Sequence, residues 1–371
     1  MASATASPAA IEVTSPASAL PGRVLALDAF RGFTMIFLTA EGFLSPLVNH
    51  PIAGPVARQF EHTVWHGMTA WDLVQPFFMF IVGAAMPFSF AKRWRAGETV
   101  AGNLHHVLKR CALLILWGLV ARSVEARKPV IDLINVLAQV SFTYLVAFLV
   151  LRRGYLVQSL TAVGMLVLDW LIYNLGTAPG VTGPWAQNAN IGWWLDGLIL
   201  NKHWSGGYAT INCIPSTFNT ILGVIAGSLL ASAIPQAKKL RLLLIGGVAG
   251  IALGLALDPV IPIIKKIWTP SFAFYSAGYT LLALALFYWL CEVMQWRRWP
   301  QVAVMVGSNS IFIYLFHEIL GHWMRQTAPV FTGWAIQWWG DWGLVFTACM
   351  ISVFQISICV WLYRRKIFFK L

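Results

Sequence analysis

Long apolar stretches alternate with short polar connections along most of this chain. A helix needs about 20 mostly apolar residues to cross the hydrocarbon core of a bilayer. By this measure the pattern predicts an all-α, polytopic membrane protein with about ten transmembrane helices, near 25–47, 69–91, 104–121, 130–151, 155–175, 211–232, 239–257, 271–293, 301–323 and 341–363.

Basic residues are concentrated in alternate connections and in the C-terminal tail. These clusters are Lys92 to Arg95, Arg152 and Arg153, Lys238 to Arg241, Arg297 and Arg298, and Arg364 to Lys370. Because cytoplasmic loops are enriched in Lys and Arg, we expect these connections and both termini to be cytoplasmic. Two termini on the same side require an even number of membrane helices, and ten meets this requirement. Arg122, Arg127 and Lys128 are a local exception, since they fall in an opposite connection.

The composition supports this interpretation, with 371 residues of which 58% are hydrophobic and 11% charged. The net charge of +12 lies in short clusters between apolar stretches, so we expect no binding of nucleic acid. Residues 1–22 are rich in Ala, Ser, Thr and Pro and predict a disordered cytoplasmic tail, followed by one membrane domain over 23–371. The five cysteines lack the spacing of metal ligands, and no metal is expected.

The strongest candidate for chemistry is the segment 60–83, where His62, His66 and Asp72 precede an apolar helix. A histidine can accept a proton near neutral pH, and a nearby carboxylate can fix its tautomer and orientation. The alternative is that the two histidines only belong to a hydrated loop. In the predicted topology this segment faces the outside.

Charged residues within predicted membrane helices are also candidates, because they are costly to insert. Asp28 and Arg31 lie three residues apart, which permits an ion pair or a ligand contact, and Glu41 lies at the expected depth of His62. Lys109 and Arg110 at a cytoplasmic helix end would attract phosphates, although ordinary flanking charge explains them equally.

Two further segments carry polar or aromatic groups. The long outer connection 176–210 contains Trp204 among several aromatic and amide residues, which suits either a sugar or an interfacial aromatic belt. The late segment GSNSIFIYLFHE places Asn309, Ser310 and His317 in an apolar helix, where they indicate a polar interior or a packing network.

Four ordered motifs carry a resemblance to a known family: LDAFRGFTMIFLTAEG, FEHTVWHGMTAWDLVQPFFMFIVGAAM, PIIKKIWTPSFAFYSAG and GSNSIFIYLFHE. Together they resemble the transmembrane heparan-alpha-glucosaminide N-acetyltransferases and their bacterial relatives. The resemblance implies a protein of the bacterial inner membrane that moves an acetyl group from cytoplasmic acetyl-CoA to the amine of a glucosamine-type sugar outside. It implies that His62 is the catalytic histidine and that Asp72 is the acidic residue of the helix that follows it. Glu41 lies in the position of a family asparagine.

The remaining roles combine this resemblance with the charged and aromatic residues described above. We expect Arg31, Lys109 and Arg110 to bind the donor phosphates, and Asn309 or Ser310 to donate to the developing oxyanion. His66, Trp204, Lys265, Trp268 and His317 are the expected substrate-binding residues. Direct transfer and an acetyl-histidine intermediate both remain open, as do two rival functions, an O-acetyltransferase of an envelope glycan and a sugar transporter. The expected partners are the glycan substrate, membrane lipid and a second copy of the chain in a dimer.

Overall fold

The computed structural model describes residues 24–369, so the predicted tail at 1–22 lies outside the described residues. The described chain is helical and contains no strand, only an isolated parallel bridge between Gly67 and Ile264. The all-α prediction is therefore confirmed. The α-helices are α1 (Leu25–Thr39), α2 (Gly54–Ala57), α3 (Val74–Arg95), α4 (Val100–Ala126), α5 (Val136–Val150), α6 (Tyr155–Leu175), α7 (Ile191–Leu200), α8 (Cys213–Ala231), α9 (Gln236–Leu257), α10 (Pro270–Tyr288), α11 (Gln301–Gly307), α12 (Ser310–Thr327), α13 (Pro329–Trp339) and α14 (Asp341–Arg364).

Short helical turns extend several of these elements. They are the 3₁₀ turns η1 (Ser45–Leu47), η2 (Arg58–Phe60), η3 (Trp71–Leu73), η4 (Ser205–Gly207) and η5 (Thr210–Asn212), and the π-helical turn η6 (Trp289–Val293). Joined to their neighbours, η3, η5 and η6 lengthen α3, α8 and α10 to 25, 22 and 24 residues. That length is enough to cross a bilayer.

Six of the described helices are long and apolar enough to be membrane spans, and the bent pair α11 and α12 makes a seventh if it counts as one. The six are α3, α6, α8, α9, α10 and α14 with their flanking turns. All ten predicted segments are helical. However, α1 and α5 have only 15 residues each, and α4 carries Lys109, Arg110 and Arg122. The number ten therefore stays a prediction.

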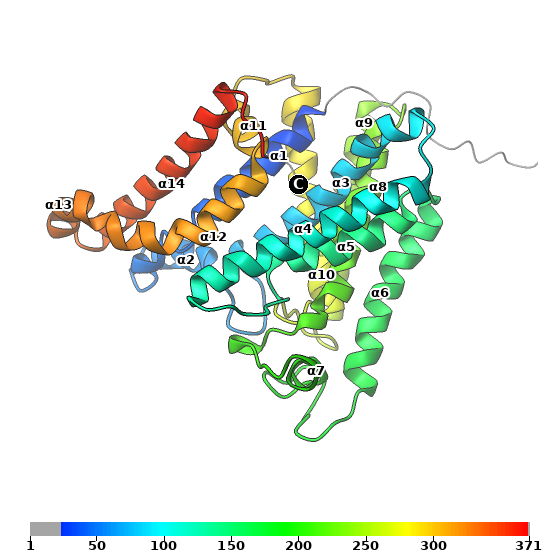
Figure 1. The fold of residues 1–371 in the computed structure, drawn as a ribbon, viewed down its shortest axis with the longest axis horizontal. Helices are drawn as coiled ribbons and strands as arrows, with labels where there is room; N and C mark the ends of the chain where they lie inside the picture. Colours follow the sequence, from blue (N-terminus) through cyan, green and yellow to red (C-terminus); the bar gives the residue numbers. More distant parts are fainter. Residues whose placement is uncertain (1–23, 370–371) are drawn as a thin grey trace, which may run out of the picture.

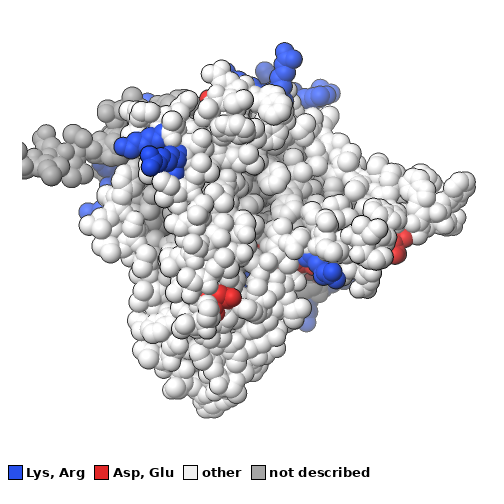
Figure 2. All heavy atoms as spheres, turned by 180° about the vertical axis from the view of Figure 1, so that it is seen from behind, with Lys and Arg blue, Asp and Glu red and all other residues white. Residues whose placement is uncertain are grey.

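Large apolar side chains cover the outside of the helices. Leu156 and Leu160 on α6 are 72% and 63% exposed, and Val248 on α9 is 60% exposed. Most of the face in Figure 2 is free of charge; Lys and Arg gather near its upper edge, and a few charged residues of both signs lie lower on the face. Such a surface is stable against lipid rather than water, as an integral membrane protein requires.

The predicted basic connections lie toward one edge of the molecule. In Figure 1 the start of α1, the end of α14 and the connections from α8 to α9 and from α10 to α11 lie at the upper edge, while α2 and α7 lie on the lower side. The arrangement fits alternating connections that fall on two sides of a membrane. Sidedness itself stays a prediction.

The largest boundary errors concern three predicted helices. The predicted helix 130–151 begins only at Val136. The first helix ends at Thr39 and not near 47, because Gly42 turns the chain with a φ of +63°, so Glu41 lies just beyond the helix. The predicted helix 301–323 is broken into α11 and α12, which meet at a bend of 76°. At this break Asn309 leaves helical geometry, and its side chain bonds the backbone of Ile367 and Phe369 near the C-terminus.

Close packing of α3 on α8 fixes the centre of the fold. Gly83 of α3 lies against the backbone of Thr220, and Gly223 of α8 lies against the backbone of Phe80. A side chain at either glycine would separate the helices, and small residues at such contacts are typical of membrane helix pairs. This rigid pair carries η3, which begins the candidate site.

Candidate functional site

A cavity of about 370 Å³ lies where α1, α3, α4 and α12 meet the loops on the lower side of Figure 1. Its apolar lining comes from α1, α3 and α12 and includes Met35, Phe78 and Tyr314. The polar lining includes residues from both ends of the chain: Glu41, His62, Arg122, Glu125, Tyr208, Lys265, His317, Glu318, His322 and Arg325. A concave site toward which polar groups converge is the usual form of a ligand-binding pocket, and this one is rich in charged groups.

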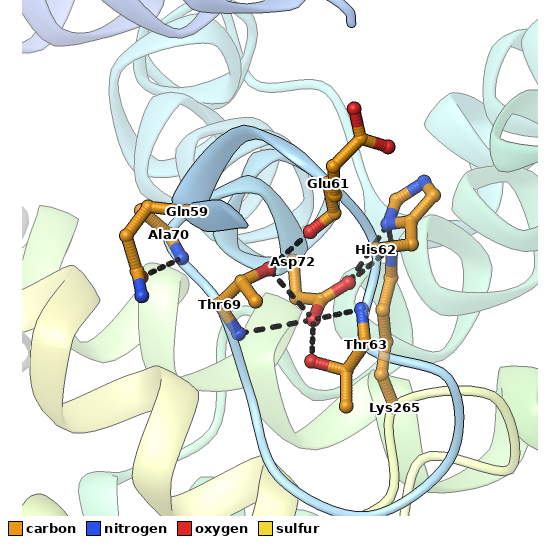
Figure 3. Close-up of polar contacts among 8 residues, drawn as sticks. All are labelled: Gln59, Glu61, His62, Thr63, Thr69, Ala70, Asp72 and Lys265. Atoms are coloured by element: carbon orange, nitrogen blue, oxygen red, sulfur yellow. Dashed lines mark hydrogen bonds and ion pairs between the residues drawn. The ribbon is translucent and has the colours of Figure 1, made fainter. Parts of the chain in front are cut away.

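His62 lines one side of the cavity and pairs with the buried Asp72, as the sequence predicted. The Nδ1 atom of His62 lies 2.8 Å from Oδ1 of Asp72 and 3.0 Å from Nζ of Lys265, and that Nζ lies 3.2 Å from the same carboxylate oxygen. Figure 3 shows the three side chains pointing toward one another from two different loops. We call these three residues the His62 cluster.

Asp72 is fully buried and is held on its other side by two threonines. Its Oδ2 accepts hydrogen bonds from the backbone N–H and the hydroxyl of Thr63, at 3.3 and 2.9 Å, and from the N–H of Thr69 at 3.1 Å (Figure 3). Oδ1 is left for His62 and Lys265. With so many donors around it the carboxylate is the favoured form, and its position is fixed.

A second histidine and carboxylate face the cavity from the opposite wall. His317 of α12 donates from Nε2 to Glu41 at 3.0 Å, and its Nδ1 lies 3.3 Å from Oε1 of Gln355 on α14. The hydrogen bond from His317 lowers the pKa of Glu41, burial opposes that shift, and Arg325 at 4.0 Å adds to it. The cavity thus has a carboxylate and histidine pair on each side.

The structure therefore brings together five of the predicted site residues: Glu41, His62, Asp72, Lys265 and His317. It also adds residues that were not predicted. Arg122 lines the cavity and is bound to Asp132 at 2.7 Å and to Glu125, which accounts for one of the three basic residues in that exceptional connection. Gln355, Thr63 and Thr69 are also part of the site. Their only sign in the sequence is that they are polar residues in or near apolar helices, which is a weak indication of a site.

Three predicted substrate-binding residues lie outside the cavity lining. His66 is exposed and pairs with Asp258 at 2.8 Å. Trp204 is buried, donates to Thr210 at 3.3 Å and is covered by the ammonium of Lys202. Their contact with substrate stays a prediction.

Trp268 is also buried, and it connects the Lys265 loop to α8. Its Nε1 donates to Asn219 of α8 at 3.2 Å, and its backbone N–H donates to the Lys265 carbonyl at 2.9 Å. Its side chain has no exposed surface, and its contact with substrate stays a prediction. Its place in the structure is that of a support for Lys265.

The five predicted donor-binding residues also lie away from the cavity lining. Arg31 pairs with Asp28 at 3.6 Å, as its spacing predicted. Lys109 is exposed on α4, and Arg110 bonds the Tyr144 hydroxyl at 3.2 Å. Asn309 holds the C-terminal segment, and the hydroxyl of Ser310 donates to the Gly307 carbonyl. Their roles toward a donor or an oxyanion stay predictions.

Comparison with known proteins gives one consistent result. Heparan-alpha-glucosaminide N-acetyltransferase of Homo sapiens is 25% identical over an alignment of 421 residues, which covers 95% of this chain and 61% of the human protein. The Mus musculus protein of the same name is 24% identical, with 94% and 60% covered. The chain is similar to heparan-alpha-glucosaminide N-acetyltransferases.

The matches cover only part of each protein. This chain spans about 60% of the length of those curated relatives. A family model described as a domain of unknown function, DUF5009, matches residues 23–174, which include His62 and Asp72 but neither Lys265 nor His317.

Within residues 24–369, no group of three or more His, Cys, Asp or Glu side chains is arranged to hold a metal ion. The chemistry that the cavity offers is proton transfer. With Nδ1 directed at Asp72, the Nε2 atom of His62 is the ring nitrogen left for a ligand, and the side chain is 42% exposed. This arrangement suits a general base or a nucleophile.

Proposed function

We propose that this protein transfers an acetyl group from acetyl-CoA to the amine of a glucosamine-type sugar, with His62 as the catalytic base. The observation that carries the proposal is the His62 cluster, in which a buried carboxylate pairs with Nδ1 of a histidine that lines the cavity, so that Nε2 is left for a ligand. Similarity to N-acetyltransferases over most of the chain supports the same reaction class.

In the proposed reaction the sugar amine attacks the acetyl carbonyl, so that an N–C bond forms and the C–S bond of the thioester breaks. Nε2 of His62 accepts the proton that the amine loses and returns it to the departing thiolate, so CoA leaves as the thiol. Asp72 holds the ring and stabilises its transient positive charge. His62 attacking the acetyl group first remains an alternative order of the same bond changes.

The donor would enter from the predicted cytoplasmic end of α4. Arg122 at the cavity follows Lys109 by 13 positions on this helix, a rise of about 20 Å at about 1.5 Å per residue. Phosphates held near Lys109 and Arg110 would therefore need an extended donor to bring a thioester to His62. CoA has that form, with its thiol at the end of a long arm and its phosphates at the other end.

The sugar would enter from the opposite side. Glu41, Glu125 and Arg325 line the cavity, and their side chains are about half exposed, which marks its open mouth. In the predicted topology this mouth faces outside the cytoplasmic membrane, so donor and acceptor would meet from two sides.

The test is acetyl transfer by the purified protein in liposomes, with radiolabelled acetyl-CoA and glucosamine as substrates. The proposal expects a labelled amide that resists mild alkaline hydroxylamine and disappears in the His62→Ala variant. A labelled ester would favour the O-acetyltransferase. Sugar uptake without acetyl-CoA and without any labelled product would favour the transporter and contradict the proposal.

A further inference from the structure

Lys265 is the least expected member of the His62 cluster, because it places a second cationic group beside the histidine. Its residue surface is 8% exposed, and its Nζ lies 3.0 Å from His62 and 3.2 Å from Asp72. Lys265 lines the cavity, and its ammonium is directed at the carboxylate that orients the histidine (Figure 3).

The loop that carries Lys265 is fixed to the loop that carries His62. The N–H of Gly67 donates to the Ile263 carbonyl at 2.8 Å, and the hydroxyl of Thr269 donates to the Pro262 carbonyl at 2.8 Å. Trp268 adopts a φ of +53° and is anchored on α8. The distance between Lys265 and His62 is therefore set by the scaffold and not by a flexible side chain alone.

The hydrogen atoms in the cluster can be assigned from these distances. Asp72 has no proton to donate as a carboxylate, so at 2.8 Å the Nδ1 atom of His62 must carry one. Lys265 then donates to the same carboxylate, because a protonated Nδ1 cannot accept from it. Burial lowers the pKa of Lys265, while the Asp72 carboxylate favours the charged ammonium.

This assignment has a consequence for the charge of His62. Asp72 alone would favour a doubly protonated, positively charged ring, whereas a cation at 3.0 Å opposes it. Other charged or titratable groups near His62 are Glu41 across the cavity, Glu61 next in sequence, and Tyr208 and Lys266, both of which interact with Asp72.

We infer that Lys265 is a positioning residue that keeps His62 uncharged between turnovers, so that Nε2 is free to accept the proton of the acceptor. This inference rests on the proposed function for its purpose, but the charge of His62 can be measured without substrate. It differs from a substrate-binding role, in which Lys265 would change acceptor affinity and leave the charge of His62 unaltered.

The full-length protein is treated with diethylpyrocarbonate at a series of pH values. The modified fraction of His62 is then measured by mass spectrometry of the peptide that contains it. The reagent attacks uncharged imidazole, and His62 is accessible to it. In Lys265→Met or Lys265→Gln, Asp72 would act unopposed, so the pH of half-maximal modification should rise by about 1 to 2 units. Lys265→Arg keeps the charge and should keep the wild-type midpoint.

Two controls separate this effect from a general disturbance. His66 is modified in the same samples, and its midpoint should stay constant because it pairs with Asp258 and not with the cluster. Lys266→Met removes the neighbouring lysine, whose ammonium lies 5.5 Å from the Tyr208 ring, and should move the His62 midpoint far less.

An unchanged His62 midpoint in both neutral Lys265 variants, with an unchanged His66 midpoint, would overturn the inference. If the His62 midpoint shifts in the Lys265 variants but the wild-type protein transfers acetyl to no amine, the electrostatic role is upheld and the proposed function is rejected. If transfer is observed, the acid limb of its pH profile should move with the His62 midpoint. A raised Michaelis constant for the sugar with an unmoved limb would assign Lys265 to substrate binding and overturn the inference.

Discussion

The most informative single substitution is Asp72→Asn, which removes one charge and keeps the shape of the side chain. Oδ1 accepts from His62 and Lys265, while Oδ2 accepts from Thr63 and Thr69. An amide has only one oxygen, so whichever way it turns, its NH₂ group meets donors on one side. Either the threonine donors or the histidine and lysine lose their acceptor.

The cost to catalysis can be bounded from this geometry. If the amide nitrogen faces His62, the ring must adopt the other tautomer to supply a lone pair at Nδ1, and Nε2 then carries a hydrogen and cannot accept one. The analogous change in serine proteases lowers kcat by about 10,000-fold, and general base catalysis is worth about 100-fold to 10,000-fold. We expect kcat/KM to fall by about 1,000-fold, or about 4 kcal/mol.

The assay is initial-rate acetyl transfer at saturating acetyl-CoA, with the thermal unfolding midpoint measured on the same sample. Asp258→Asn is the matched control, because Asp258 also accepts from a histidine at 2.8 Å but lies outside the cavity lining. We expect that control to lose less than about 3-fold. An Asp72→Asn protein that is folded and keeps activity within about 3-fold of wild type would refute the role of Asp72.

Three further predictions concern topology, the donor and stability. A single cysteine at Ile52, which is 84% exposed, should react with impermeant maleimide in intact cells while one at Ala96 is protected; the reverse pattern would invert the topology. Lys109→Ala and Arg110→Ala should each weaken acetyl-CoA binding by about 10-fold to 150-fold in titrations, since a charge-assisted contact is worth about 1.5 to 3 kcal/mol; unchanged affinity in both would place the phosphate site elsewhere. Asp169 of α6 is fully buried, and neither carboxylate oxygen has a hydrogen-bond partner among the described residues, so Asp169→Leu should raise the unfolding midpoint; a lower midpoint would show that the carboxyl group is stabilised by a partner.

The positions of the six long apolar helices were predictable because a membrane helix must be apolar over a fixed length, which hydropathy along the chain reveals. The ends were less predictable. Glu41 lies beyond α1 because Gly42 turns the chain, and the break before α12 depends on Asn309 binding the C-terminal backbone, a contact over 58 residues. Neither feature has a periodic signal.

The pairing of His62 with Asp72 was predictable because both lie in one short segment. Lys265 is 203 residues from His62, and its contact depends on two loops held together by Gly67 and Ile263. The pairing of Glu41 with His317 spans 276 residues and could be suggested only by their expected depth in the membrane. Resemblance to a family named these residues, but their mutual geometry required the fold.

The central claim is that His62, and not His66, performs the proton transfer. It is tested most directly by comparing single-turnover acetyl transfer in His62→Ala and His66→Ala, with acetyl-CoA binding measured for both. We expect no detectable transfer by His62→Ala with donor binding intact, and only a mild loss for His66→Ala. Near wild-type transfer by His62→Ala, together with inactivation of His66→Ala, would contradict it.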